Sequence, residues 1–179
     1  MLPCFFSPER NAMHLISRLL RPLVLALAVF PPCAAMAGPS MVYLVRHGEK
    51  ATVGQDPELT PQGQARARNI ATILGRAGIT AIFSTPYART QQTAKPLASS
   101  LGLEVQSYDP RAPKALVEKV KTLQGPVLVV GHSNTLGELV TLFGGTPGAE
   151  IGDDEYDRLY QLIGTEGKVT TVMLRSVGQ

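Results

Sequence analysis

The chain has 179 residues, and its 17 Lys and Arg against 14 Asp and Glu give a formal net charge of +3. Three basic residues (Arg10, Arg18 and Arg21) and one acidic residue (Glu9) precede residue 38, so the 142 residues that follow carry 14 basic and 13 acidic side chains, a net charge of +1. This balance excludes binding to nucleic acid through bulk positive charge. With no internal repeat and no low-complexity tract, residues 38–179 are predicted to form one domain with a substantial core.

Residues 1–37 have the pattern of a secretory signal peptide. Arg18 and Arg21 precede the apolar stretch 23–30, and Ala35-Met36-Ala37 is a small-x-small cleavage site before Gly38. The apolar stretch is much shorter than the ~20 residues that span a bilayer, so cleavage is favoured over a stable membrane anchor. We therefore expect a periplasmic or secreted domain of residues 38–179.

Two details of this leader bear on the mature domain. Met13 would itself start a signal peptide of ordinary length, so it is an alternative start. Both cysteines, Cys4 and Cys33, lie in the leader, and a domain without thiols is compatible with an oxidising compartment.

From residue 38 onward, short apolar runs alternate with amphipathic stretches, which is typical of βαβ units. We expect strands at 41–45, 80–83, 104–107 and 127–130, helices at 60–76, 86–100 and 113–123, and, after Gly131-His132, a helix that ends at Gly144-Gly145. Strands at 158–163 and 168–175 form a hairpin that supplies an antiparallel edge. The predicted fold is an α/β, three-layer α/β/α sandwich with a mainly parallel sheet and an antiparallel edge.

The first predicted helix has a clear start. Thr60 is a good N-cap, and Pro61 suits the first helical position. We expect the inner side of this helix to carry Ala65, Ile70, Ile73 and Leu74, and its arginines, Arg66, Arg68 and Arg76, to lie at the surface.

Both histidines of the predicted domain lie where a strand gives way to a loop. His47 follows the strand 41–45 through Arg46, and His132 follows the strand 127–130. Ligands of parallel sheets bind outside the carboxyl ends of the strands, so both imidazoles are expected at one crevice. Arg89 comes shortly after a third strand end. Two imidazoles and two guanidiniums would form a cationic pocket suited to a phosphoryl group.

Four motifs occur in order along the chain: Arg46-His47-Gly48-Glu49, Leu59-Thr60-Pro61-Gln62-Gly63, Ser84-Thr85-Pro86 followed by Arg89, and Gly131-His132-Ser133. Together they resemble the histidine phosphatase superfamily, with its phosphoglycerate-mutase-like fold, over residues 41–175.

The resemblance implies a role for each residue of the pocket. His47 would be the nucleophile, forming a phosphohistidine that water then hydrolyses. Arg46, Arg89 and His132 would bind the phosphoryl group. A protonated His132 would oppose charging of His47 and keep the nucleophile neutral.

The proton donor for the leaving group is less well defined by the sequence. Ser133 stands where the acid-phosphatase branch of the family has an aspartate. Asp109 occupies the region where mutase-like members carry a carboxylate, and Glu49 beside the nucleophile is the second candidate. The alternatives are an Asp109 that only shapes a turn and a Glu49 that is solvated or paired with an arginine. If neither donates, good leaving groups or phosphoramidates become the favoured substrates.

The leading hypothesis is an exported, metal-independent phosphomonoesterase that acts on a small phosphorylated substrate, with no cofactor and no nucleic-acid partner. The acidic residues at positions 150–157 are interpreted as a solvated turn, because no histidine is near them. A phosphohistidine-protein phosphatase and a non-catalytic module that binds phosphate or phosphosugar are the alternatives, and a mutase fits poorly because the loops are short. The sequence identifies neither the substrate nor the oligomeric state.

Overall fold

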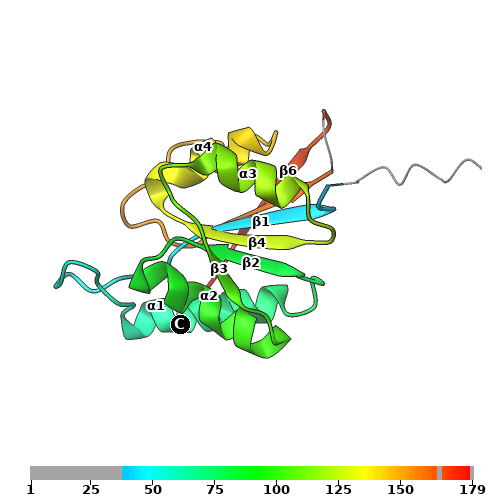
Figure 1. Ribbon diagram of the computed structural model, residues 1–179. Helices are drawn as coiled ribbons and strands as arrows, with labels where there is room; N and C mark the ends of the chain where they lie inside the picture. The colour runs from blue at the N-terminus through cyan, green and yellow to red at the C-terminus, as the bar shows by residue number, and fades with distance from the viewer. Residues whose placement is uncertain (1–37, 165–166, 178–179) are drawn as a thin grey trace, which may run out of the picture. The chain divides into compact units, whose positions relative to one another are not determined.

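The computed structural model describes residues 38–164 and 167–177 (Figure 1). The predicted signal peptide, residues 1–37, lies outside the described residues, as do its Ala35-Met36-Ala37 cleavage site and both cysteines. Within the described ranges, no helix has both the length and the apolar character needed to cross a membrane.

The described chain forms a six-stranded sheet in the order β3-β2-β4-β1-β5-β6. β3, β2, β4 and β1 are parallel, whereas β5 pairs antiparallel with β1 and β6 pairs antiparallel with β5. The strands are β1 (Met41–Arg46), β2 (Ala81–Ser84), β3 (Val105–Ser107), β4 (Val127–Gly131), β5 (Arg158–Ile163) and β6 (Thr170–Arg175). The predicted α/β class, with its mainly parallel sheet and antiparallel edge, is confirmed.

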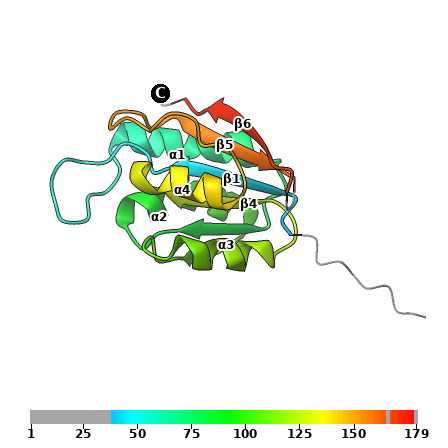
Figure 2. The ribbon, with the colours of Figure 1, turned by 90° about the horizontal axis from the view of Figure 1, so that it is seen from above.

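Helices cover both faces of the sheet. α1 (Pro61–Leu74) and α2 (Ala88–Leu101) lie on one face, and α3 (Pro113–Lys121) and α4 (Ser133–Leu142) lie on the other (Figures 1 and 2). Each of the ten elements expected from the sequence is present, and no end is displaced by more than two residues.

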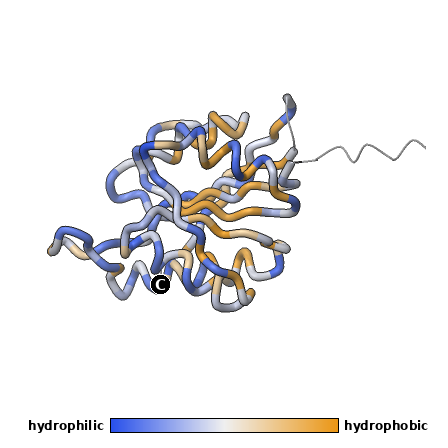
Figure 3. The backbone as a smooth tube through the Cα atoms, in the orientation of Figure 1, coloured by the Kyte–Doolittle hydropathy of each residue, from blue (hydrophilic) through white to orange (hydrophobic). Residues whose placement is uncertain are grey.

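Alternate residues of each central strand enter opposite layers of the core, as the two-residue period of a strand requires. Val129 packs in the layer beneath α3 and α4, and Leu128 and Val130 pack in the layer beneath α1 and α2. The central strands carry the most hydrophobic colouring of the backbone tube in Figure 3. β4 is buried along its whole length, because it is paired on both edges and covered on both faces.

The buried face of α1 differs from the expected one. Gly63, Arg66, Ala67, Ile70 and Leu74 are buried, whereas Ile73 is 39% exposed. The inward position assigned to Ile73 was therefore wrong, and Ala65 is only half-buried. The observed stripe has the three- and four-residue spacing of one helical face, and it includes an arginine that the hydrophobic pattern alone would exclude.

The start of α1 lies against the loop that follows β1. The backbone N–H of Thr60 donates to the carbonyl of Glu49 at 2.8 Å, and the Thr60 hydroxyl caps the helix by accepting from Gly63 N at 3.1 Å. A Cβ atom on Gly63 would lie 2.2 Å from the Glu49 carbonyl oxygen, and one on Gly48 would lie 2.7 Å from the Gly63 carbonyl oxygen. Glycine at both positions lets the two backbones touch.

Gly63→Ala should therefore destabilise the protein by about 1–3 kcal/mol, because the added methyl group displaces backbone from backbone. Gly152→Ala is the matched control, since a Cβ atom there meets nothing within 4 Å. Urea unfolding of both variants measures the difference. Equal stability of Gly63→Ala and the parent would contradict the close contact.

Candidate active site

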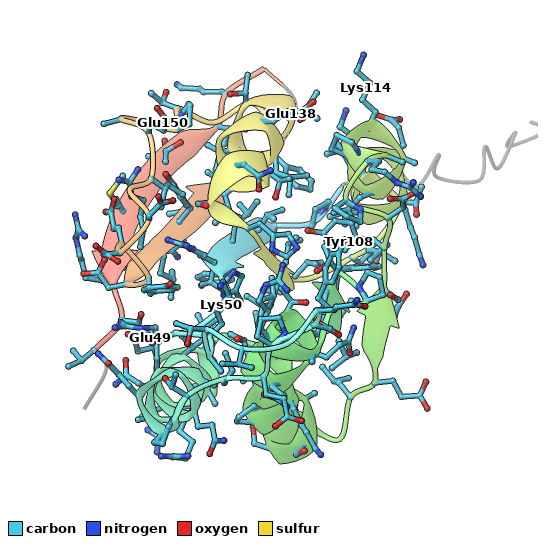
Figure 4. All side chains as sticks on the ribbon, turned by 90° about the vertical axis from the view of Figure 1, so that its left-hand side faces the viewer. Glu49, Lys50, Tyr108, Lys114, Glu138 and Glu150 are labelled. Carbon is cyan, nitrogen blue, oxygen red and sulfur yellow. The ribbon has the colours of Figure 1, made fainter. Side chains whose placement is uncertain are left out.

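The pairing of β1 with β4 brings the two histidines together. Arg46 and Gly131 are partners in the register, and the backbone N–H of His47 extends the ladder by donating to the Gly131 carbonyl at 3.0 Å. The rings of His47 and His132 then meet edge to face, with 5.4 Å between their centroids. The two strand ends thus form one site at the carboxyl edge of the sheet, the edge viewed in Figure 4.

His47 is held as a neutral imidazole. Its ring lies 2.8 Å from the Gly48 carbonyl through Nδ1, and because a carbonyl only accepts, Nδ1 carries the proton. Burial lowers the pKa of His47 to about 3, and the positive charge of Arg89 acts in the same direction. Nε2 therefore keeps its lone pair, which is what a nucleophile for phosphorus requires.

His132 is also neutral in this arrangement. Its Nε2 lies 3.0 Å from the hydroxyl of Thr85, and its Nδ1 lies 3.5 Å from Nη2 of Arg89. Burial lowers the pKa of His132 to about 4, and Arg89 and Arg46 lower it further. The protonated His132 considered from the sequence as the group that keeps His47 neutral is disfavoured here, because desolvation and two neighbouring guanidiniums oppose the imidazolium.

Arg46 is fixed along one edge and free along another. Its Nη1 donates to the carbonyls of Gly152, Asp153 and Glu155 at 2.9, 2.8 and 3.0 Å, and its plane lies 4.1 Å from the centre of the Tyr156 ring. Its Nε is buried and has no hydrogen-bond partner. Burial lowers the pKa of Arg46, and an anion would compensate both this desolvation and the missing hydrogen bond.

Arg89 reaches the same site from the first turn of α2. Its Nη1 lies 3.5 Å from the carboxylate of Asp56, and its guanidinium stacks over the Tyr87 ring at 4.6 Å. Its Nε, like that of Arg46, is buried without a partner. The two guanidiniums lie beside the two imidazoles, as expected from the sequence, and each guanidinium has a buried Nε that is free to donate to a phosphate oxygen.

Glu49 lies beside α1 (Figure 4). Its carboxylate forms an ion pair with Arg66 at 2.6 Å. Burial acts to raise the pKa of Glu49, but the hydrogen bonds and charge of Arg66 outweigh it and hold the pKa below its usual value. A carboxylate held ionised does not donate a proton, so the structure argues against Glu49 as the general acid.

The surface position predicted for Arg66 was wrong. Arg66 is 7% exposed, and its Nη1 also donates to the Ser176 carbonyl at 2.8 Å. The side chain therefore ties the loop after His47 to the end of the chain beyond β6. Arg66 lies on the same helical face as Gly63 and Ile70, and this spacing was the signal in the sequence that its side chain would be buried.

Asp109 is near the site but is engaged elsewhere. It lines a cavity of about 510 Å³ together with Tyr87, Tyr108 and Arg111. Its exposed carboxylate accepts from Nε and Nη2 of Arg111 at 3.1 Å, and these bonds lower the pKa of Asp109. The predicted role of Asp109 as proton donor therefore has no support in its contacts.

Several residues of the site gave no signal in the sequence. Tyr156 tilts over His47 with 5.9 Å between centroids, and Tyr87 meets His132 at 5.3 Å. Asp56 accepts from the backbone N–H of Ala88 at 2.9 Å, which caps α2 from a distant loop. The acidic residues around Tyr156, interpreted as a solvated turn, contribute carbonyls to Arg46, and the described part of the chain holds no cluster suited to a metal ion.

Comparison with known proteins identifies the family. The model of the histidine phosphatase superfamily (branch 1) matches residues 42–112. A "probable phosphoglycerate mutase GpmB" of Enterobacter sp. is 36% identical over 126 residues, which cover 64% of this chain and 54% of that protein. Residues 42–112 thus match the histidine phosphatase superfamily, and the similarity to this relative extends over 126 residues. It spans little more than half the length of this curated relative.

Solved structures agree with this fold. The SixA protein of Agrobacterium tumefaciens superposes with a TM-score of 0.60 at 21% identity, covering 79% of this chain and 99% of that one. Phosphoserine phosphatase of Entamoeba histolytica, in complex with 3-phosphoglyceric acid, gives 0.59 at 17% identity and covers 76% of this chain and 97% of that one.

The lowered pKa values of the two histidines predict how stability depends on pH. Each starts from 6.5 in the unfolded chain and falls to about 3 (His47) or about 4 (His132) on folding, so the unfolded state binds more protons between these values. The free energy of unfolding should therefore decrease as the pH falls below 6.5. Urea unfolding near pH 7.5 and pH 5 measures this loss. His132→Gln should lose less stability than the parent over that interval, and an equal loss would show that His132 is not buried neutral.

Proposed function

We propose that this protein is an exported, metal-independent phosphatase that hydrolyses phosphomonoesters through a phosphohistidine on His47. The observation that carries this proposal is the neutral imidazole of His47, its Nε2 free, beside two guanidiniums whose buried Nε atoms have no partner. A phosphoryl group between Arg46 and Arg89 would supply acceptors for both Nε atoms and present phosphorus to His47.

Each step of the proposed reaction has a residue of the site to perform it. Nε2 of His47 attacks phosphorus and the bond to the leaving oxygen breaks, while Arg46 and Arg89 neutralise the charge on the phosphoryl oxygens. The Gly48 carbonyl keeps the proton on Nδ1, so the phosphorylated ring carries positive charge and is a good leaving group when water attacks. His47 returns to its neutral form with the release of phosphate.

Two lines of support favour a phosphatase. The fold superposes on a phosphoserine phosphatase over 97% of that chain, and the motif around His47 lies within residues 42–112, which match the histidine phosphatase superfamily model. The curated relatives named as mutases are matched over only part of their length. Because these relatives are named mutases, mutase activity is the competing assignment within the family.

A phosphohistidine-protein phosphatase is the second candidate. One observation favours it: Glu49 and Asp109, the two carboxylates expected to donate a proton, are both bound to arginines. The nitrogen of a phosphoramidate needs less help in leaving than an alkoxide does. Turnover of a phosphohistidine protein at a much higher rate than any phosphomonoester would favour this candidate.

Export is proposed from the pattern of residues 1–37. Arg18, Arg21 and the apolar stretch 23–30 should direct secretion, with cleavage after Ala37. N-terminal sequencing of the protein from the periplasm or medium should begin at or near Gly38. An exported form that retains the leader would contradict cleavage.

Rapid quench in alkaline denaturant with a radiolabelled phosphomonoester tests the central step. The label should appear on the protein in an acid-labile, base-stable bond, and His47→Ala should abolish both the label and turnover. Arg89→Ala should keep the nucleophile but lose transition-state stabilisation, which costs at least ~10²-fold in kcat. EDTA should leave turnover unchanged, because arginines and histidines supply the charge.

Each arm of this experiment has a contradicting result. Full activity of His47→Ala would exclude the covalent route. Binding of inorganic phosphate without any turnover or label would instead identify a phosphate-binding module. Loss of turnover in EDTA, restored by a divalent ion, would overturn metal independence.

A further inference from the structure

The contacts of His132 indicate which group supplies the proton that an alkoxide leaving group needs. This step rests on the proposed function, since it concerns the same reaction. Glu49 and Asp109 are each held as carboxylates by an arginine. The reaction therefore needs another group that reaches the phosphoryl site and carries a removable proton.

A chain of buried hydroxyls fixes the tautomer of His132. The Thr90 hydroxyl lies 2.8 Å from the Tyr87 carbonyl and 3.0 Å from the Thr85 carbonyl, and since carbonyls only accept, Thr90 donates there. Its oxygen then accepts from the Thr85 hydroxyl at 2.8 Å. The Thr85 oxygen in turn accepts from Nε2 of His132 at 3.0 Å. Each hydroxyl has one proton, so Nε2 of His132 is the protonated nitrogen.

The other edge of the ring leads to the same assignment. Nδ1 of His132 lies 3.5 Å from Nη2 of Arg89, which can only donate. Nδ1 is therefore an acceptor in the site without an anion, and it faces the guanidinium that would hold the phosphoryl group. A neutral His132 in this tautomer has no proton to offer to a phosphoryl oxygen.

We propose that His132 takes up a proton on Nδ1 when a phosphoryl group binds and gives that proton to the leaving oxygen. The chain of Thr85 and Thr90 hydroxyls supports this role by accepting the other ring proton. His132 is thus the general acid of the first step, in place of a carboxylate.

The charges around His132 determine when it is protonated. Arg89 from α2, Arg46 and His47 from the end of β1, and the edge-on ring of Tyr87 face it, and Asp56 pairs with Arg89 on its far side. Burial keeps the His132 pKa low, and the positive charges of Arg89 and Arg46 act in the same direction. A bound phosphoryl dianion offsets both positive charges and favours the imidazolium.

The reaction balances with one proton. The substrate dianion binds with one proton taken from solvent onto Nδ1 of His132, or the monoanion brings it. Nε2 of His47 bonds to phosphorus, the bond to the leaving oxygen breaks, and that oxygen takes the proton from Nδ1 as the alcohol departs. In the second step Nδ1, now neutral, accepts a proton from the attacking water, which restores the imidazolium.

The dependence of rate on the leaving group tests this role. His132→Gln should slow an alkyl phosphate at least ~10²-fold more than a nitrophenyl phosphate, whose leaving group departs without a proton. Asp109→Asn is the control and should slow both substrates equally or not at all. Equal slowing of both substrates by His132→Gln would overturn the proposal and leave His132 as a phosphate-binding residue only.

The two threonine variants provide a second test that does not alter His132 itself. Thr85→Val removes the acceptor for the Nε2 proton, so the imidazolium should become less stable and the alkaline limb of kcat for an alkyl phosphate should move down by about one pH unit. Thr85→Ser keeps the hydroxyl and should restore the parent profile. An unchanged limb in Thr85→Val would contradict the support of the His132 imidazolium by the Thr85 hydroxyl.

The label trapped by the alkaline quench separates this proposal from the proposed function. If the label forms on His47 but the leaving-group test fails, only the role of His132 as acid is wrong. If no label forms with any substrate, the phosphatase mechanism itself fails.

Discussion

The register of β1 against β4 is the constraint on which the site depends. The hydrogen bond from His47 N to the Gly131 carbonyl continues the parallel ladder by one residue and places two strand ends side by side. Because β4 is paired on both edges and buried on both faces, neither strand end can shift without breaking the core. A slip of the register by one residue would turn His132 to the other face of the sheet.

The second property of the site is that it buries two guanidiniums, those of Arg46 and Arg89, with unpaired Nε atoms. Arg46 is held by backbone carbonyls and Tyr156, and Arg89 by Tyr87 and Asp56, yet each keeps a buried Nε without a partner. Burial keeps both imidazoles neutral, and the same positive charges act in that direction. The site is thus arranged to receive negative charge, which would satisfy the guanidiniums and change the protonation of His132 together.

The sequence predicted the elements and the four central residues because both follow from local rules. Apolar runs define strands, and residues at the carboxyl ends of parallel strands converge, so His47 and His132 were predictable. The partners that decide each role were not, because they come from distant loops or from backbone atoms. The carbonyls of Gly152 and Asp153 that hold Arg46, and the ion pair of Arg66 with Glu49, depend on tertiary packing. Neither hydropathy nor spacing encodes them.

The nitrogen to which phosphate becomes attached tests the central claim most directly. In this account the Gly48 carbonyl holds the proton on Nδ1 of His47, so only Nε2 can attack phosphorus. Nuclear magnetic resonance of the trapped intermediate, with nitrogen-15 in the histidine rings, distinguishes the two nitrogens. Phosphorus bonded to Nε2 of His47 is the predicted result. Phosphorus on Nδ1 of His47, or on His132, would contradict the arrangement described.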